Sequence, residues 1–259
     1  MSKILWKLKL SSIFLIYKKQ FRIRFFPSSL SAAYWVDPEA RKGDEIFLSS
    51  YLKKGDLFVD VGANIGVLTL TAAAIVGDSG KVISIEAHPR IYGYLQQNVA
   101  MNSFRNISLI NAVVGEKKGK VCFSDNRADD QNAVVLESAL EVKMDTLDEL
   151  VGRELKIINL LKVDVEGYEK FVFDGASRIL WATECIYFES WEKHFFEYGY
   201  SCKDIFSLLA NYQFKVYKLN DCVITPITAS YCSSVVENMV AIRNLNSFME
   251  RTGFTVAVR

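Results

Sequence analysis

Short apolar runs alternate with helical segments along residues 55–115, and glycines mark several of the turns between them. The apolar runs are five to eight residues long, which is the usual length of a buried strand. This alternation predicts a parallel sheet whose strands are joined by crossover helices. We predict strands at residues 57–61, 81–85 and 107–114 and helices at residues 67–76 and 89–102.

The pattern is interrupted at residues 116–145, where turn-forming residues separate two short apolar runs and predict a hairpin-like insertion. The crossover order then resumes with residues 157–163, whose near-continuous apolar run suits a strand buried on both faces. Residues 254–258 are suited to pair at a sheet edge. We predict the remaining strands at residues 186–188, 214–217 and 235–242, seven in all, and helices at residues 168–180 and 202–211.

The first 30 residues differ from the rest, because they carry seven basic groups and no acidic one among many apolar residues. Such a segment suits either an amphipathic element at an anionic membrane surface or a helix packed on the domain or on a second copy. We therefore divide the chain into an N-terminal basic amphipathic segment with its lead-in (residues 1–50), a main domain (residues 51–245) and a C-terminal tail (residues 246–259).

Composition excludes several classes of protein. Half of the 259 residues are hydrophobic and only four are proline, which argues against a disordered or low-complexity chain. The net charge of +1 lacks the excess expected of a general nucleic-acid binder, so no nucleic-acid partner is expected. The five cysteines form no CxxC pair, and no secretory or membrane-spanning pattern is evident. We expect a cytoplasmic protein. Peripheral contact with the inner membrane surface through residues 1–26 is a further option.

A glycine-bearing turn follows the first predicted strand, in the position where doubly wound sheets hold their cofactors. Gly62 and Gly66 let the backbone turn tightly and approach a ligand, and Asn64 tolerates the left-handed conformation. Asp60 ends the strand, and Glu86 follows twenty residues after Gly66, where an acid can accept both hydroxyls of a ribose. This pair of signals predicts a nucleoside site but does not separate NAD from S-adenosylmethionine.

The segment Lys162-Val163-Asp164-Val165-Glu166-Gly167-Tyr168-Glu169 places three carboxylates and a lysine at the carboxyl edge of the fourth crossover strand. It follows Asp-Val-Gly-Ala-Asn-Ile-Gly at residues 60–66, Glu-x-x-Pro at residues 86–89 and Thr-Leu-Asp at residues 146–148. In this order and spacing, residues 51–190 closely resemble the FkbM-type methyltransferases.

The resemblance implies a Rossmann-like, seven-stranded class I methyltransferase sheet, mostly parallel with one antiparallel strand and flanked by helices. It also implies an S-adenosylmethionine-dependent enzyme that methylates a hydroxyl of a sugar, a glycan or glycolipid precursor, or a natural product. The residues implied to hold the cofactor are Asp60, Gly62, Asn64, Gly66, Glu86, Asn111, Ala112 and Asp164. Ala87 departs from the proline that the family commonly has after this glutamate, and Asn111 stands where the class often has an acid.

Methylation of an alcohol requires alignment of acceptor and methyl group and removal of a proton. The candidate catalytic residues are Asp164, Glu166, Glu189 and His194, and Glu169 suits either catalysis or the first turn of a helix. Clustered carboxylates can also bind a hard cation, but such a site needs ligands that converge in space, and we expect no metal.

Two other functions stay open at this point. A nicotinamide-dependent oxidoreductase would use the same glycine turn and Glu86, although the segment at residues 162–169 disfavours it. A cofactor-binding or membrane-associated module without transfer activity is the other. The acceptor's identity and the oligomeric state, a homo-oligomer included, are not readable from the sequence.

Overall fold

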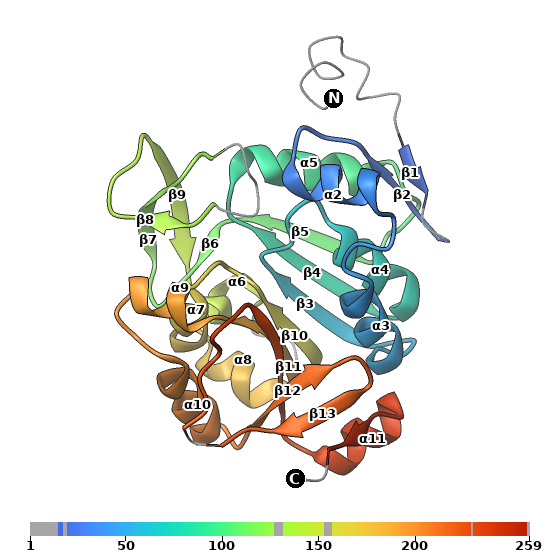
Figure 1. Cartoon of the computed structure of the whole chain (residues 1–259). Coiled ribbons are helices and arrows are strands. Elements are labelled where there is room, and N and C mark those ends of the chain that lie inside the picture. The colour runs from blue at the N-terminus through green and yellow to red at the C-terminus, as the bar shows by residue number, and fades with distance from the viewer. Residues whose placement is uncertain (1–14, 18–19, 127–131, 153–156, 229, 258–259) are drawn as a thin grey trace.

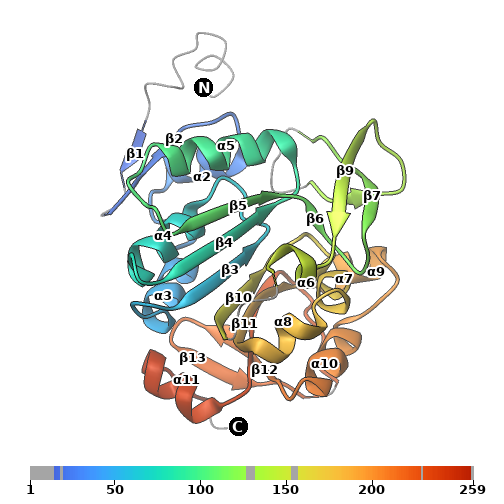
Figure 2. The same ribbon diagram turned by 180° about the vertical axis from the view of Figure 1, so that it is seen from behind.

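The computed structural model describes residues 15–17, 20–126, 132–152, 157–228 and 230–257. A nine-stranded sheet with helices on both faces forms the body of the molecule, and a four-stranded sheet stands beside it (Figures 1 and 2). The strands of the large sheet, in chain order, are β3 (Leu57–Val61), β4 (Lys81–Glu86), β5 (Ile107–Asn111), β10 (Ile158–Val163), β11 (Thr183–Ser190), β12 (Lys215–Asn220), β13 (Val223–Pro226), β14 (Glu237–Ile242) and β15 (Thr255–Val256).

The large sheet has the order β5-β4-β3-β10-β11-β14-β12-β13-β15. Its first five strands are parallel, and β14 runs antiparallel to both of its neighbours. The predicted α/β fold with a mostly parallel sheet is therefore confirmed, but the count of seven strands was too low. The additional strands are β13, which turns back from β12 as a hairpin, and β15, which pairs with β13. Both run antiparallel to the first five strands, as β14 does, so the prediction of one antiparallel strand was also too low. Pairing of the C-terminal run at an edge is confirmed for residues 255–256.

Strand residues alternate between two cores. Val59 and Leu161 pack on one face of the sheet, whereas Phe58 and Leu160 pack on the other. Because both faces are buried, the central strands are nearly continuous in apolar residues. The first face is covered by α6 (Leu147–Leu150), α7 (Glu169–Asp174), α8 (Ser177–Ala182), α9 (Glu192–Glu197) and α10 (Cys202–Asn211). The second is covered by α3 (Lys42–Tyr51), α4 (Val67–Val76), α5 (Pro89–Ala100) and α11 (Leu245–Thr252).

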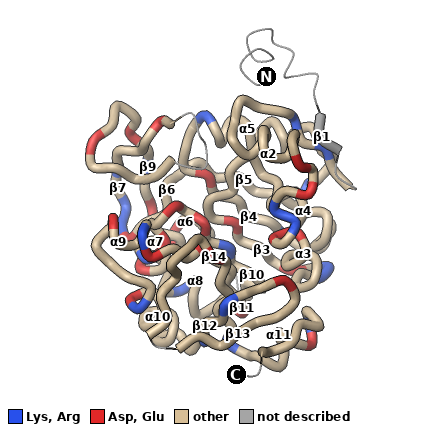
Figure 3. The backbone as a smooth tube through the Cα atoms, in the orientation of Figure 1, with Lys and Arg blue, Asp and Glu red and all other residues tan. Residues whose placement is uncertain are grey.

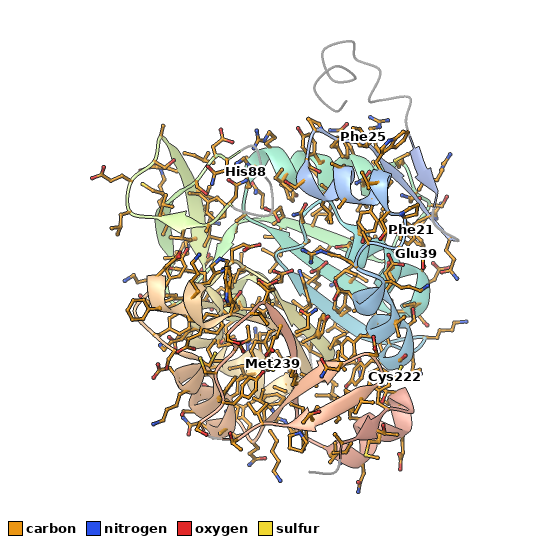
Figure 4. The ribbon with its side chains drawn as sticks, viewed as in Figure 1. Phe21, Phe25, Glu39, His88, Cys222 and Met239 are labelled. Carbon is orange, nitrogen blue, oxygen red and sulfur yellow. The ribbon has the colours of Figure 1, made fainter. Side chains whose placement is uncertain are left out.

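The predicted third strand divides between the two sheets. Its first part is β5, and its last two residues form β6 (Val113–Val114), which pairs with β9 (Leu140–Asp145). The insertion is larger than the hairpin predicted, because β9 also pairs with β7 (Gly119–Phe123), and β7 pairs with β8 (Val134–Val135). His88, beside this insertion in Figure 4, lies 3.1 Å from Asp125 Oδ1 through its Nε2 atom and so ties the insertion to α5.

The predicted helix at residues 168–180 is wrong as a single element. α7 ends before Gly175, where an added Cβ would lie 2.0 Å from the carbonyl oxygen of Gly115. This close contact between backbones is possible only for glycine. The Asp148 carboxylate then accepts from the backbone N–H groups of Arg178 and Ile179, at 3.0 and 2.9 Å, and starts α8 as a new helix.

The described part of the N-terminal segment packs on the domain rather than forming a continuous helix. β1 (Leu15–Tyr17) and β2 (Arg22–Arg24) pair antiparallel, and α2 (Ser29–Val36) follows. Phe21 and Phe25, labelled in Figure 4, are buried, as are Ile23 and Phe26. The packed interpretation therefore holds for residues 21–26, while residues 1–14 and 18–19 lie outside the described chain.

No helix among the described residues has the length and apolar character needed to cross a membrane. Acidic and basic positions are interspersed along the chain in Figure 3, in keeping with a net charge of +1.

Candidate functional site

Two adjoining cavities open at the carboxyl ends of the central strands. The first, which we call the cofactor pocket, lies over the ends of β3, β4 and β10. The second, which we call the acceptor cleft, lies between the insertion, the end of β11 and α9. They share four lining residues, so a molecule in one can reach a molecule in the other. The shared residues are Arg41, Val134, Glu166 and Tyr168.

The glycine turn forms one wall of the cofactor pocket. Gly62 has φ +80°, and an added Cβ would lie 1.9 Å from the carbonyl oxygen of Asp164, so the loops after β3 and β10 touch through their backbones. Asn64 adopts φ +51°, the left-handed conformation expected from the sequence. Gly66, at φ +90°, begins α4 and packs against Leu95. Gly62, Ala63 and Asn64 of this turn line the pocket.

Glu86 ends β4 and faces this turn with its carboxylate fixed from both sides. Its Oε1 accepts the backbone N–H of His88 at 2.8 Å, and its Oε2 accepts that of Asn64 at 2.9 Å. Burial raises the pKa of Glu86 to about 7, against the effect of these hydrogen bonds. Each oxygen keeps a further lone pair, so the carboxylate can still accept hydroxyl groups of a ligand.

Asp60 and Lys162 support this wall from behind. Asp60 Oδ2 accepts from the Thr69 hydroxyl at 2.7 Å, and its Oδ1 lies 3.3 Å from Lys162 Nζ. Lys162 Nζ donates to the carbonyl oxygen of Gly62 at 2.7 Å. Asp60 is fully buried and is not among the residues that line the pocket. Its position indicates that it fixes the turn rather than contacts a ligand.

Three predicted cofactor residues thus lie outside the pocket lining, namely Asp60, Gly66 and Asn111. The Asn111 amide donates to the carbonyl oxygens of Glu86 and Ala87, at 2.8 and 2.9 Å, and so fixes the end of β4. The other predicted residues come together in the lining of one cavity. They are Gly62, Asn64, Glu86, Ala112 and Asp164.

Asp164 has a cationic neighbour that the sequence did not reveal. Arg41, just before α3, places its Nη1 atom 3.4 Å from Asp164 Oδ2, and Lys162 Nζ lies 3.5 Å from the same oxygen. Burial acts to raise the pKa of Asp164, but the charges of Lys162 and Arg41 outweigh it and lower the pKa overall. Asp164 is therefore ionised at neutral pH and a weak base.

The acceptor cleft brings three of the predicted catalytic residues together. One ligand atom from each of Glu166, Glu189 and His194 lies within 4.8 Å of the others. His194 Nδ1 is 3.7 Å from Glu166 Oε2, and Gly167 packs directly against His194, which holds this loop close to α9. Burial lowers the pKa of His194, so its ring is neutral at pH 7.

Glu189 differs from the other two, because its carboxylate has no hydrogen bond or ion pair within the described part of the chain. Burial, together with the negative charges of Asp164 and Glu169, raises the pKa of Glu189 to about 8. A carboxylate with a pKa near the working pH is suited to accept a proton.

The sequence left open whether Glu169 acts in catalysis or in the first turn of a helix, and the structure places it in the first turn of α7. It is buried at the start of α7, and its Oε1 accepts the backbone N–H of Val165 at 2.9 Å. Burial raises its pKa to about 7. The hydrogen bond closes the loop that carries Asp164 and Glu166, so Glu169 shapes the site without lining either cavity.

Most of the site residues described above lie within a segment that matches a known protein family. A family profile described as the methyltransferase FkbM domain matches residues 60–216, which is more than half of the chain. The hexuronic acid methyltransferase AglP of Haloferax volcanii is 27% identical over 173 residues, which cover 65% of this chain and 68% of that protein.

Two further similarities are more limited. A probable cobalt-precorrin-6B C(15)-methyltransferase of Sulfolobus acidocaldarius is 34% identical over 67 residues, which cover 26% of this chain and 35% of that relative's length. The crystal structure of an FkbM methyltransferase from Methylobacillus flagellatus KT has a TM-score of 0.46 at 15% identity, covering 72% of this chain and 43% of that one. With the profile matched over most of the chain, this protein belongs to the FkbM methyltransferase family.

Proposed function

We propose that the protein transfers the methyl group of S-adenosylmethionine to a hydroxyl of a sugar, a glycan or glycolipid precursor, or a natural product. The observation that carries the proposal is the Glu86 carboxylate, fixed opposite the glycine turn in a pocket that opens into an acidic cleft. The protein's membership of the FkbM methyltransferase family supports the reaction class.

The pocket lining fits the proposed cofactor. Glu86 offers acceptor oxygens for the two ribose hydroxyls, and Ala112 with Phe123 offers an apolar surface for a base. Asp164 lines the pocket and pairs with Arg41, which lines both cavities, and a carboxylate there would stabilise cationic parts of the cofactor. S-adenosylmethionine supplies, when bound, a methyl group made electrophilic by its sulfonium.

The acceptor cleft supplies the groups that an alcohol acceptor needs. We assign the role of general base to Glu189, because its carboxylate has no hydrogen bond or ion pair among the described residues and its pKa lies near 8. Glu166 and His194 lie beside it and would orient the hydroxyl. Trp191 and Tyr198 also line the cleft, as aromatic side chains on which a sugar ring could stack. The hexuronic acid methyltransferase among the relatives supports an acceptor of the sugar class.

Glu86 makes cofactor affinity dependent on pH. A ribose hydroxyl donates to the ionised carboxylate, so protonation removes an acceptor, and affinity should rise with pH through about 7. S-adenosylhomocysteine should bind roughly tenfold more tightly at pH 8 than at pH 6. In the Glu86→Gln variant, binding should be weaker and lose this dependence. Calorimetric titration at several pH values measures both effects, and an unchanged pH dependence in the variant would argue against the assigned role of Glu86.

The reaction itself is tested by measuring S-adenosylhomocysteine formation against a panel of sugars, uronic acids and lipid-linked saccharides. We expect turnover with at least one hydroxyl acceptor and loss of turnover in Glu189→Gln. A chelator arm tests the expectation of no metal, since EDTA should leave the rate unchanged. A rate that falls with EDTA and returns with a divalent cation would instead assign Glu166, Glu189 and His194 to a metal.

The alternative functions have less support. Family membership disfavours the nicotinamide-dependent oxidoreductase, which rested on the glycine turn and Glu86 alone. A module without transfer activity would have little use for a carboxylate of raised pKa at Glu189 in the acceptor cleft. A cytoplasmic location, membrane contact through residues 1–26 and a homo-oligomer stay predictions.

A further inference from the structure

Arg41 lies at the junction of the two cavities but comes from outside the residues that match the family. It precedes Asp60 by 19 positions and sits just before α3 with φ +60°, a left-handed conformation that is uncommon for arginine. Its guanidinium lies 3.4 Å from Asp164 Oδ2 and 3.9 Å from Asp44 Oδ2. Asp44 is held in turn by the hydroxyl of Tyr187 and by the amide of Asn238, which fixes this side of the junction.

Two basic side chains line the described part of the cofactor pocket, Arg41 and Lys162, and they differ in availability. Lys162 is buried, and its ammonium group is engaged with Asp60, Asp164 and the Gly62 carbonyl oxygen. The side chain of Arg41 is 40% exposed. A guanidinium has five N–H donors, so Arg41 can keep its contact with Asp164 and still bind another anion.

The ligand proposed for this pocket ends in an α-amino acid, with an ammonium and a carboxylate group. If the ribose is held at Glu86, this end extends along the glycine turn toward Asp164 and Arg41. A negative and a positive side chain that lie 3.4 Å apart complement such a zwitterion. The amino-acid end itself carries no net charge, so it leaves the balance of Asp60, Lys162, Asp164 and Arg41 unchanged.

We propose that Arg41 binds the α-carboxylate of the cofactor, with Asp164 binding the α-ammonium. Arg41 is thus a cofactor-binding residue contributed by the N-terminal part of the chain. This inference rests on the proposed function, since it assumes S-adenosylmethionine in the pocket.

The test compares two ligands in two proteins by calorimetric titration. S-adenosylhomocysteine carries the α-carboxylate, whereas its decarboxylated analogue lacks only that group. We expect Arg41→Gln to weaken the binding of S-adenosylhomocysteine roughly 10- to 100-fold, the loss of affinity typical of a charge-assisted hydrogen bond. The decarboxylated analogue should bind both proteins with Kd values within about threefold of each other, because the group that Arg41 would bind is missing.

Two further variants exclude simpler explanations. Arg41→Lys should recover part of the affinity for S-adenosylhomocysteine, because it keeps the charge but not the planar fork. Lys193→Gln removes a cation that lines the acceptor cleft and not the cofactor pocket, and it should leave both Kd values unchanged. Thermal melts of all variants show whether they are folded.

The possible results distinguish failure of the Arg41 inference from failure of the proposed function. Equal weakening of both ligands by Arg41→Gln would overturn the inference, because Arg41 would then act through Asp164 or the fold. An unchanged affinity for S-adenosylhomocysteine would overturn it as well. A folded wild-type protein that binds neither ligand would contradict the proposed function itself.

Discussion

Glu189→Gln is expected to lower kcat by roughly 10²- to 10⁴-fold, the usual contribution of a general base, while the affinity for S-adenosylhomocysteine changes by less than about threefold. The glutamine keeps the shape of the side chain but cannot take the acceptor's proton. Because Glu189 lines the acceptor cleft and not the cofactor pocket, catalysis and cofactor binding should separate. Steady-state kinetics together with calorimetric titration measure the two effects.

The assignment of Glu189 as the base also predicts how kcat changes with pH. A base must be unprotonated to act, so kcat of the wild-type protein should rise with pH through about 8, the pKa of Glu189. This rise should be absent from the residual activity of Glu189→Gln. Glu184→Gln, at the other end of β11, is the matched control, because a glutamine oxygen can still accept from Asn159. A Glu189→Gln enzyme with kcat within threefold of wild type would rule out the assignment.

Gly62→Ala is expected to destabilise the folded protein by about 2–5 kcal/mol, the sum of left-handed strain and overlap in a packed region. The added methyl would lie 1.9 Å from the carbonyl oxygen of Asp164 and 2.9 Å from its carbonyl carbon. Both are backbone atoms, so the loop after β10 has to move. Binding of S-adenosylhomocysteine should weaken in parallel, because the same loop carries Asp164.

Gly199→Ala separates strain from overlap in this prediction. Gly199 also has a positive φ, +77°, but an added Cβ there meets no atom within 4 Å. Its substitution should cost only the conformational strain, about 1–2 kcal/mol. Denaturant unfolding of the two variants gives the comparison. Equal losses of stability would show that the contact between the loops after β3 and β10 contributes little.

The parts of the fold that the sequence predicted well are those governed by local patterns. α4 and α10 begin and end where the sequence predicted, because apolar runs and flanking polar or glycine residues mark their limits. The broken helix at Gly175 could not be predicted, since the break depends on a contact with Gly115, 60 positions earlier in the chain. The division between β5 and β6 depends likewise on pairing with β9, whose distance along the chain hides it.

In the site, too, the positions set by local sequence were predicted, whereas contacts between distant parts of the chain were not. Glu86, Asp164 and Glu189 lie at or next to the carboxyl ends of parallel strands, so the sheet topology alone placed them at one edge. The ion pair between Asp164 and Arg41 could not be predicted, because the two residues are 123 positions apart in the chain. No motif surrounds Arg41, and its charge was one of many along the first 60 residues. Its left-handed conformation before α3 is visible only in the folded chain.

The most direct test of the central claim is calorimetric titration of S-adenosylhomocysteine into the wild-type protein and the Glu86→Ala variant at pH 8. We predict saturable binding with one site per chain in the wild type. We also predict at least a tenfold loss of affinity in a variant that stays folded, because the ribose hydroxyls lose their acceptor. A folded wild-type protein that shows no saturable binding up to millimolar ligand, or a Glu86→Ala variant of unchanged affinity, would contradict the cofactor site described above.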